Sequence, residues 1–168
     1  MILAVACAAT GCAPSPAPSP SPSSSGFTSD AEAFAAAEAT YRAYVDALNQ
    51  VDLADPTTFE PVFAWSGGSL EEADRQSFET ARENGLIIGG DFRVVTTSGV
   101  DWDRYTGSVR LHACLDVSAT EITGAAGNRQ QGEDREPRVA LILTLSPGDT
   151  ATRLRLTDTQ PREDQTLC

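Results

Sequence analysis

The amino-acid sequence predicts an α+β domain in which three helices precede an antiparallel sheet of four or more strands. Two capping boxes, Ser29 with Glu32 and Ser69 with Glu72, mark helix starts. Beyond Gly85 the spacing of apolar residues changes from about 3.6 to about 2, which is the change from helix to strand. Because the later segments have one apolar and one polar face, we expect the helices to cover one side of the sheet.

Helical periodicity is clearest directly after Ser29. One face of this first helix carries Phe34, Ala37, Tyr41, Tyr44, Val45 and Leu48. The helix is expected to end between residues 49 and 55, where Asp55-Pro56 supplies the cap and first position of a short second helix. The apolar residues of the second helix are Phe59, Val62 and Phe63. A third helix is expected to stop at Asn84-Gly85. Its apolar residues are Leu70, Ala73, Phe78 and Ala81.

The strands are predicted from alternating apolar and polar residues. A first strand, bent or bulged at Gly89-Gly90, has Leu86, Ile88, Phe92 and Val94 on one face. The second, residues 105–117, has on its apolar face Tyr105, Val109, Leu111, Ala113, Leu115 and Val117. The third carries Val139, Leu141, Leu143 and Leu145, and the fourth Leu154 and Leu156. Residues 124–137 are expected to form a long hairpin loop with frayed strand ends, and residues 147–149 a tight turn.

Composition and charge limit the number of domains and the classes of function that the chain can have. The chain has 168 residues, and without a leader and tether of about 28 it has room for one domain. Apolar residues make up 40% and charged residues 21%, which are the values of a globular protein. The net charge is −12, and all 12 basic residues are arginine. An acidic domain without basic runs argues against nucleic-acid binding and against electrostatic attraction to an anionic membrane.

Residues 1–12 resemble the end of a bacterial lipoprotein signal. Their apolar stretch is followed by Thr10-Gly11 and then Cys12, as in a lipobox. Ala9 stands where leucine is usual, and no basic residue precedes the apolar core, so we expect the translation start to lie upstream. Cys7 also follows small residues, but the proline-rich run begins directly after Cys12. The sequence therefore predicts lipidation at Cys12, and the alternative is an ordinary cleaved secretory signal.

Residues 13–28 form a Pro/Ser-rich tether. Every second residue between positions 14 and 22 is proline, a pattern that favours the polyproline II conformation. At about 3.1 Å per residue, such a tether holds a domain up to about 50 Å from a bilayer. We therefore expect an extracytoplasmic protein that is anchored to the outer face of the cell membrane through lipid.

The cysteines predict one disulfide and argue against a structural metal. No Cys-x-x-Cys pair occurs, and a single histidine is not enough for a Cys2His2 zinc site. With Cys12 lipidated and Cys7 removed with the leader, Cys114 and Cys168 remain. An even pair in an oxidising compartment predicts a disulfide between them. We expect no metal and no cofactor.

Three segments resemble a known family. Residues 37–49 (AEATYRAYVDALN), 59–63 (FEPVF) and 114–118 (CLDVS) are similar to those of small NTF2-like lipoproteins of high-GC Gram-positive (actinobacterial) bacteria, a largely uncharacterised group. The resemblance covers about residues 29–168. It implies an NTF2-like (cystatin-like) cone, in which a curved antiparallel sheet wraps the three N-terminal helices, and it does not specify an activity.

No catalytic residue is assigned from the sequence. His112 shares a strand face with Arg110 and Asp116, but no nucleophile motif accompanies them, so a solvated or interface histidine is favoured. NTF2-like isomerases and cyclases require a carboxylate and a phenol in an apolar cavity. The available residues of these types are Tyr41, Tyr44, Asp46, Asp101, Asp103 and Tyr105.

The charge runs at residues 101–103 and 133–136 lack a calcium-loop pattern and are interpreted as solvated loops. Trp65 and Trp102 are interpreted as core or loop anchors, with the rim of a pocket as the alternative.

The sequence as a whole favours a non-enzymatic binding or accessory domain in the cell envelope. The alternative is an NTF2-like isomerase or cyclase acting on a small hydrophobic substrate. Besides the membrane, the expected partner is an envelope protein or a small hydrophobic or anionic ligand, and a homodimer is a further option. The candidate binding face is the polar side of the sheet, with Arg93, Arg110, His112, Arg153 and Arg155. A cavity holding a carboxylate and a phenol would instead favour the enzyme.

Overall fold

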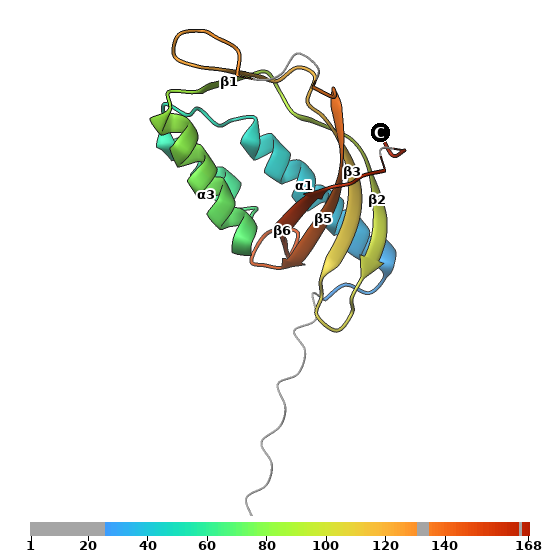
Figure 1. Cartoon of the computed structure of the whole chain (residues 1–168). Helices are drawn as coiled ribbons and strands as arrows, with labels where there is room; N and C mark the ends of the chain where they lie inside the picture. The colour runs from blue at the N-terminus through green and yellow to red at the C-terminus, as the bar shows by residue number, and fades with distance from the viewer. Residues whose placement is uncertain (1–25, 131–134, 165) are drawn as a thin grey trace, which may run out of the picture.

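The computed structural model describes residues 26–130, 135–164 and 166–168. Cys12 and most of the expected tether lie outside these residues. The α+β prediction is confirmed, with helices first and strands after them (Figure 1). The helices are α1 (Asp30–Leu48), the 3-10 helix η1 (Pro56–Thr58), α2 (Glu60–Phe63) and α3 (Gly68–Glu83). The strands are β1 (Ile87–Gly89), β2 (Arg93–Trp102), β3 (Val109–Asp116), β4 (Glu121–Thr123), β5 (Arg138–Pro147) and β6 (Leu154–Pro161).

The strands form two antiparallel sheets of unequal size. The larger sheet has the order β2-β3-β5-β6, and a two-stranded sheet pairs β1 with β4. The larger sheet curves around α1, which packs against β2, β3 and β6, while α3 packs against β6 (Figure 1). We call the side of this sheet that faces α1 its inner face, and the opposite side its outer face.

Helix α1 begins where its capping box predicts. The Ser29 hydroxyl accepts a hydrogen bond from the Glu32 N–H at 3.2 Å. The Glu32 carboxylate accepts from the N–H and the hydroxyl of Thr28, at 2.8 and 2.9 Å, so the reciprocal bond is made one residue earlier than expected. The helix buries the face that the sequence indicates, including Ala37, Tyr41, Tyr44 and Val45. The predicted second helix is divided into η1, capped by Asp55, and α2.

The predicted capping box of α3 is wrong. The helix begins at Gly68 after Gly67, and Ser69 lies inside its first turn with its hydroxyl donating to the Thr157 carbonyl at 3.4 Å. Gly67 donates to the Leu156 carbonyl at 2.9 Å, so a bridge to β6 fixes the chain before the helix can start. The helix ends as predicted, with Gly85 in the left-handed region at φ 63°.

Two strand predictions need correction. The expected first strand is two strands, because the chain turns at Gly90 (φ 75°) between β1 and β2, which belong to different sheets. The strand expected over residues 105–117 begins only at Val109. Tyr105 lies in the preceding turn and is 72% exposed, because the Asp103 carboxylate accepts from the N–H groups of Tyr105 and Thr106. Asp101 and Trp102, expected in a loop, close β2.

The core lies between the inner face and the helices. Fully buried inner-face residues are Val109, Leu111, Ala113, Leu143, Leu145, Leu154 and Leu156. Gly99 on β2 allows α1 to approach closely, since a Cβ there would lie 2.3 Å from the Phe34 ring. The β5–β6 turn at Gly148 is present as predicted. A turn over residues 124–128 follows β4, and residues 131–134 of the expected long loop lie outside the described residues.

Candidate functional site

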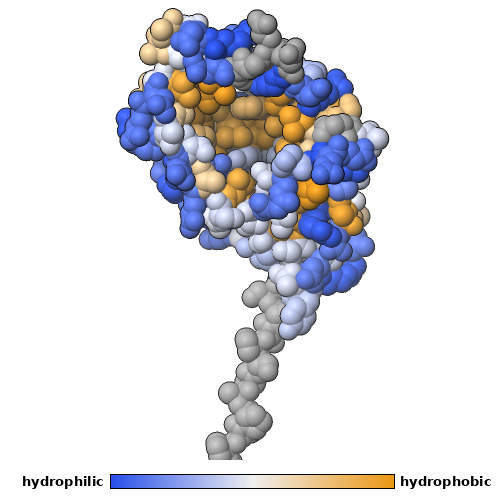
Figure 2. All heavy atoms as spheres, viewed as in Figure 1, coloured by the Kyte–Doolittle hydropathy of each residue, from blue (hydrophilic) through white to orange (hydrophobic). Residues whose placement is uncertain are grey.

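An apolar hollow opens between the helices and the sheet (Figure 2). Hydrophobic side chains form its interior and hydrophilic ones surround its mouth, and it lies at the end of the molecule away from the chain entry at residue 26. Several apolar residues at this end are only partly buried against the core: Leu48, Val51, Leu86, Ile88, Phe92, Leu115 and Leu141. We assign these residues to the lining because they come from the elements around the mouth, namely the end of α1, β1, the end of β3 and the start of β5.

The topology explains why the hollow stays open. Leu115 and Leu141 belong to the inner-face rows that continue from the buried Ala113 and Leu143, yet both are partly exposed. Helix α1 ends at Leu48, and α3 packs on β6 at the other side of the gap. No long helix therefore covers this end of the inner face in the described chain. Beneath β1 lies a pocket of about 210 Å3. It is lined by Val51, Asp52, Leu53, Ala54, Leu86, Ile87 and Ile88.

A carboxylate and a phenol meet between α1 and α3. The Tyr44 hydroxyl lies 3.1 Å from each carboxylate oxygen of Asp74 and donates to this group. Burial raises the pKa of Asp74, and the nearby Glu71 carboxylate acts in the same direction, while hydrogen bonds from Tyr44 and Ser66 oppose the shift. Tyr44 is buried and Asp74 is half-buried, so the carboxylate keeps some access to solvent.

A second phenol lies one helical turn before Tyr44. Tyr41 is 2% exposed, and its hydroxyl has no hydrogen-bond partner among the described residues. Burial raises the pKa of both phenols, which therefore remain protonated donors at neutral pH. A buried hydroxyl without a partner is unusual in a folded protein. The interior thus combines apolar walls with a small number of polar groups.

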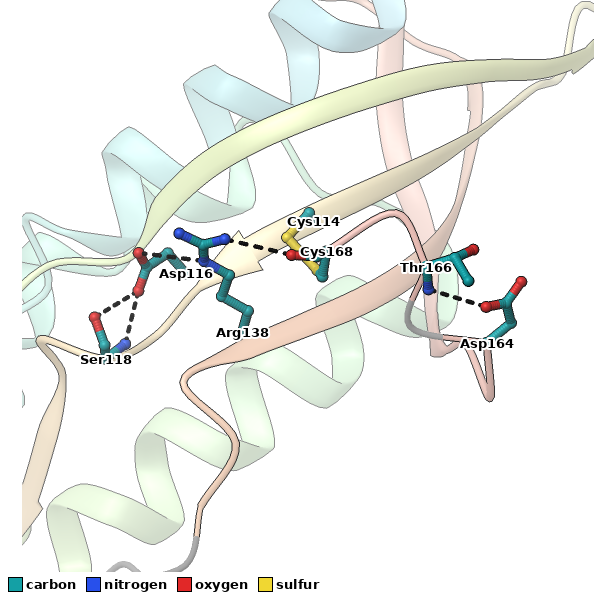
Figure 3. Close-up of a disulfide and its surroundings, with 7 residues drawn as sticks. All are labelled: Cys114, Asp116, Ser118, Arg138, Asp164, Thr166 and Cys168. Atoms are coloured by element: carbon teal, nitrogen blue, oxygen red, sulfur yellow. Dashed lines mark hydrogen bonds and ion pairs between the residues drawn. A yellow bond between two sulfur atoms is a disulfide. The ribbon is translucent and has the colours of Figure 1, made fainter.

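The predicted disulfide is present on the outer face (Figure 3). Cys114 on β3 and Cys168 are joined across 5.3 Å between Cα atoms, which attaches the C-terminal segment to the sheet. Arg138 donates to the Cys168 carbonyl at 3.3 Å and lies 3.9 Å from the Asp116 carboxylate. Hydrogen bonds from Ser118 hold the pKa of Asp116 below its usual range. A groove of about 450 Å3 beside the disulfide is lined by Asp116, Ser118, Glu136, Pro137, Arg138 and Cys168.

The five residues of the predicted binding face do not form one surface. Arg93 lies opposite Asp116, and Arg110 is 3.9 Å from the Asp101 carboxylate, so acidic partners offset both charges. Burial and the charges of Arg162 and Arg110 lower the pKa of His112, which favours the neutral imidazole at neutral pH.

The other two arginines of that set lie elsewhere. Arg153 precedes β6 and donates to the Gly26 carbonyl at 3.1 Å and to the Glu32 carboxylate at 2.8 Å, beside the chain entry. Arg155 donates to the Ser66 carbonyl at 3.4 Å, at the β6 edge near α3. An arginine face for an anionic partner is therefore not assembled.

The other residues considered from the sequence for catalysis or for the rim of a pocket are either exposed or packed against the core. Asp46, Asp101, Asp103 and Tyr105 are exposed and lie outside the interior. Trp65 and Trp102 pack against the core, in agreement with an anchoring role. Sequence analysis did not identify Asp74, although Asp74 lies at helical spacing from Leu70 and Phe78 on the stripe that α3 turns inward. That spacing is the signal that could have found it.

Comparisons with known proteins give a fold and no activity. No family model matches the chain, and no curated protein matches it. Among solved structures, the intermembrane space region of the chloroplast protein ARC6 is similar, with a TM-score of 0.52 and 11% identity. The match covers 74% of this chain and 92% of that one, so it shows a shared fold alone. In the described part of the chain, no group of three or more His, Cys, Asp or Glu is placed to hold a metal ion. No helix there is long and apolar enough to cross a membrane.

Proposed function

We propose that this protein is a lipid-anchored, extracytoplasmic binding module with an NTF2-like cone, and that its hollow binds a small apolar ligand. The observation that carries this proposal is the open apolar hollow of Figure 2. Ligand sites are typically concave, mostly apolar and provided with a few polar groups. The Tyr44–Asp74 pair supplies such polar groups in this interior.

The proposed location rests on the disulfide and on the position at which the chain enters the domain. The Cys114–Cys168 disulfide is typical of proteins that fold in an oxidising compartment. The chain enters the domain at Gly26, at the end away from the hollow (Figure 1). A lipid on Cys12 and an extended tether would therefore hold the mouth of the hollow away from the membrane. Intact-mass measurement of the envelope-extracted protein and its Cys12→Ser variant tests the anchor. An unmodified wild-type mass would contradict it.

Binding is favoured over catalysis by the hydrogen bonds of the pair. In an NTF2-like isomerase the carboxylate removes a proton while a phenol stabilises the developing oxyanion. Here the Tyr44 hydroxyl is already donated to Asp74, and this bond opposes the rise in the Asp74 pKa that burial causes. The arrangement holds a polar group in place and leaves Tyr44 without a free proton for a substrate.

The binding test uses an environment-sensitive naphthylamine dye, N-phenyl-1-naphthylamine, whose fluorescence rises in an apolar site. We expect saturable binding to the wild-type protein and about tenfold weaker binding to Leu141→Trp, which fills the hollow. Ile142→Trp is the matched control, because Ile142 is the next residue of β5 and lies on the outer face. Equal affinities for both variants, or no saturable binding to the wild type, would contradict the proposal.

An isomerase remains a second candidate because a carboxylate with a raised pKa and a phenol do lie together. In that reaction Asp74 would remove a proton from the carbon next to a ketone and return it two carbons further along. The observation that favours it is that Asp74 is half-buried and hydrogen-bonded to the buried Tyr44. Conversion of a β,γ-unsaturated ketone to its conjugated isomer, lost in Asp74→Asn, would establish this candidate. A wild-type rate equal to that of Asp74→Asn would exclude it for such substrates.

A further inference from the structure

The polar groups of the interior lie along the helix faces that lead to the hollow. Tyr44 is four residues before Leu48, so both side chains lie on one face of α1. Asp74 lies four residues before Phe78 on the inward stripe of α3. The hydrogen bond between Tyr44 and Asp74 therefore joins the two helices one turn before Leu48 on α1 and one turn before Phe78 on α3. A ligand head that reaches one helical turn past Leu48 into the interior would meet this pair.

The hydrogen-bonding capacity of this pair is incomplete. Tyr44 has one proton, and it lies equally far, 3.1 Å, from both oxygens of the Asp74 carboxylate. A carboxylate accepts about four hydrogen bonds, so Asp74 has acceptor sites left on its solvent-accessible side. Tyr41 adds a buried donor that has no partner among the described residues. A group that donates a hydrogen bond would match the acceptor sites left on Asp74.

The charge of the site selects against anions. Asp74 has no ion pair among the described residues. The guanidinium of the adjacent Arg75 lies 3.7 Å from the Phe63 ring centroid and pairs with Glu71, so it is engaged elsewhere. The domain as a whole is acidic, with a net charge of −12. An anionic group beside Asp74 would lose its hydration and be repelled by like charge.

Resting on the proposed function, we propose that the ligand of the hollow is an amphiphile with one apolar chain or ring system and an uncharged hydroxyl-type head that binds the Tyr44–Asp74 pair. An alcohol donates its proton to a remaining acceptor site of the Asp74 carboxylate. Its apolar part occupies the lining between Leu48, Leu115 and Leu141. The structure thus assigns a head-group preference to the site as well as an apolar character.

The test compares molecules that share one chain and differ in their heads. Decanol, decanoate and decylammonium are each used to displace the bound naphthylamine dye at neutral pH. We expect decanol to compete at least about tenfold better than decanoate, since burying a charge beside a carboxylate is unfavourable. Equal competition by decanol and decanoate would overturn the head-group assignment while leaving the hollow as a binding site. Stronger competition by decylammonium than by decanol would overturn the uncharged head. Failure of the dye itself to bind would overturn the proposed function and this inference together.

Two variants and one control variant locate the effect. Asp74→Asn removes the charge and keeps the shape, so decanoate should approach decanol to within about twofold. Glu72→Gln is the matched control, because it removes one charge from an exposed position of the same helix and should leave the ratio unchanged. Tyr44→Phe keeps the Asp74 charge, so discrimination against decanoate should persist. Loss of discrimination in Glu72→Gln, or its persistence in Asp74→Asn, would contradict a role of Asp74.

Discussion

The two ends of this domain are stabilised in different ways. At the closed end, where the chain enters, the Phe27 ring packs edge-on against Trp102, with centroids 6.0 Å apart, and the Arg153 guanidinium lies 4.2 Å from the Phe27 ring. Arg104 covers Trp102 at 4.4 Å. At the open end, apolar side chains such as Leu115 and Leu141 remain partly exposed around the hollow, and the disulfide lies on the outer face beside them (Figures 1 and 3).

This difference shows how a small domain keeps a hollow open. The closed end brings two hairpin turns and the chain entry together, so ring packing, arginine–ring contacts and hydrogen bonds fix the strands there. The open end cannot be filled in this way without losing the hollow. At this end the Cys114–Cys168 bond attaches the C-terminal segment to β3, and β1 pairs with β4 in the two-stranded sheet. The disulfide thus adds a covalent constraint at the end where apolar residues such as Leu115 and Leu141 are only partly buried.

Removing the disulfide should give the largest loss of stability. A double substitution, Cys114→Ala with Cys168→Ala, frees a segment that the bond closes over 54 residues of sequence. The chain-entropy model gives a loss of about 4 kcal/mol in the free energy of unfolding. Urea unfolding checks this value. Hydrogen exchange should accelerate most at the ends of β3 and β5 near the hollow. Uniform acceleration that includes the closed end would contradict the comparison.

The next largest effect should be a difference in stability between two leucine truncations in one strand, one near each end of the domain. Leu145 is fully buried near the closed end, and Leu141 is partly exposed near the open end on the same face of β5. Leu145→Ala should lower the free energy of unfolding by about 3 kcal/mol because it removes buried contacts and leaves a cavity. Leu141→Ala should cost about 1 kcal/mol, because its side chain buries less apolar area. Urea unfolding of both variants checks the ratio, and equal losses would show that the open end is packed as tightly as the closed one.

The sequence predicted what depends on periodicity and missed what depends on distant contacts. The inner-face leucines of β3 and β5 follow from alternation, and α1 follows from its capping box. The start of α3 could not be predicted from the sequence, because it depends on the hydrogen bond from Gly67 to Leu156 on β6, which fixes the chain just before Ser69. The hollow could not be predicted from the sequence either, since it depends on which strand ends the helices leave uncovered. Asp74 was overlooked because α3 is mostly polar and exposed, although its spacing from Phe78 marked it as inward-facing.

A smaller effect should follow from removing the arginine that covers the closed end. Arg153→Gln eliminates the guanidinium above Phe27 and its hydrogen bond to the Gly26 carbonyl. A cation over an aromatic ring contributes about 0.5 to 1 kcal/mol at a partly exposed site, and we expect a loss of this size in urea unfolding. Arg104→Gln is the parallel variant at Trp102, and it should cost a similar amount. A loss above about 2 kcal/mol would mean that the closed end depends on charge more than on packing.

The smallest effect concerns pH at the closed end. The Thr28 N–H, followed by the Arg153 guanidinium, lowers the pKa of Glu32 from 4.5 to about 2. Because the folded state holds this proton less tightly than the unfolded state, the contribution of Glu32 to stability is complete above pH 4.5. It disappears as the pH falls toward about 2. Glu32→Gln should therefore differ from the wild type in unfolding free energy near neutral pH and converge with it in acid.

The carboxyl titration of Glu32, followed by NMR, separates the two causes. Thr28 contributes more than Arg153, so Arg153→Gln should raise the pKa of Glu32 only part of the way to 4.5. A full return to the ordinary value would show that the arginine dominates, and that the closed end is held by an ion pair rather than by the backbone of the chain entry. A partial return would assign the pH dependence to the hydrogen bonds between Thr28 and Glu32, which fix the chain as it enters α1. At the open end the disulfide lies beside Leu115 and Leu141, and the stability of that end is expected to depend mainly on this bond.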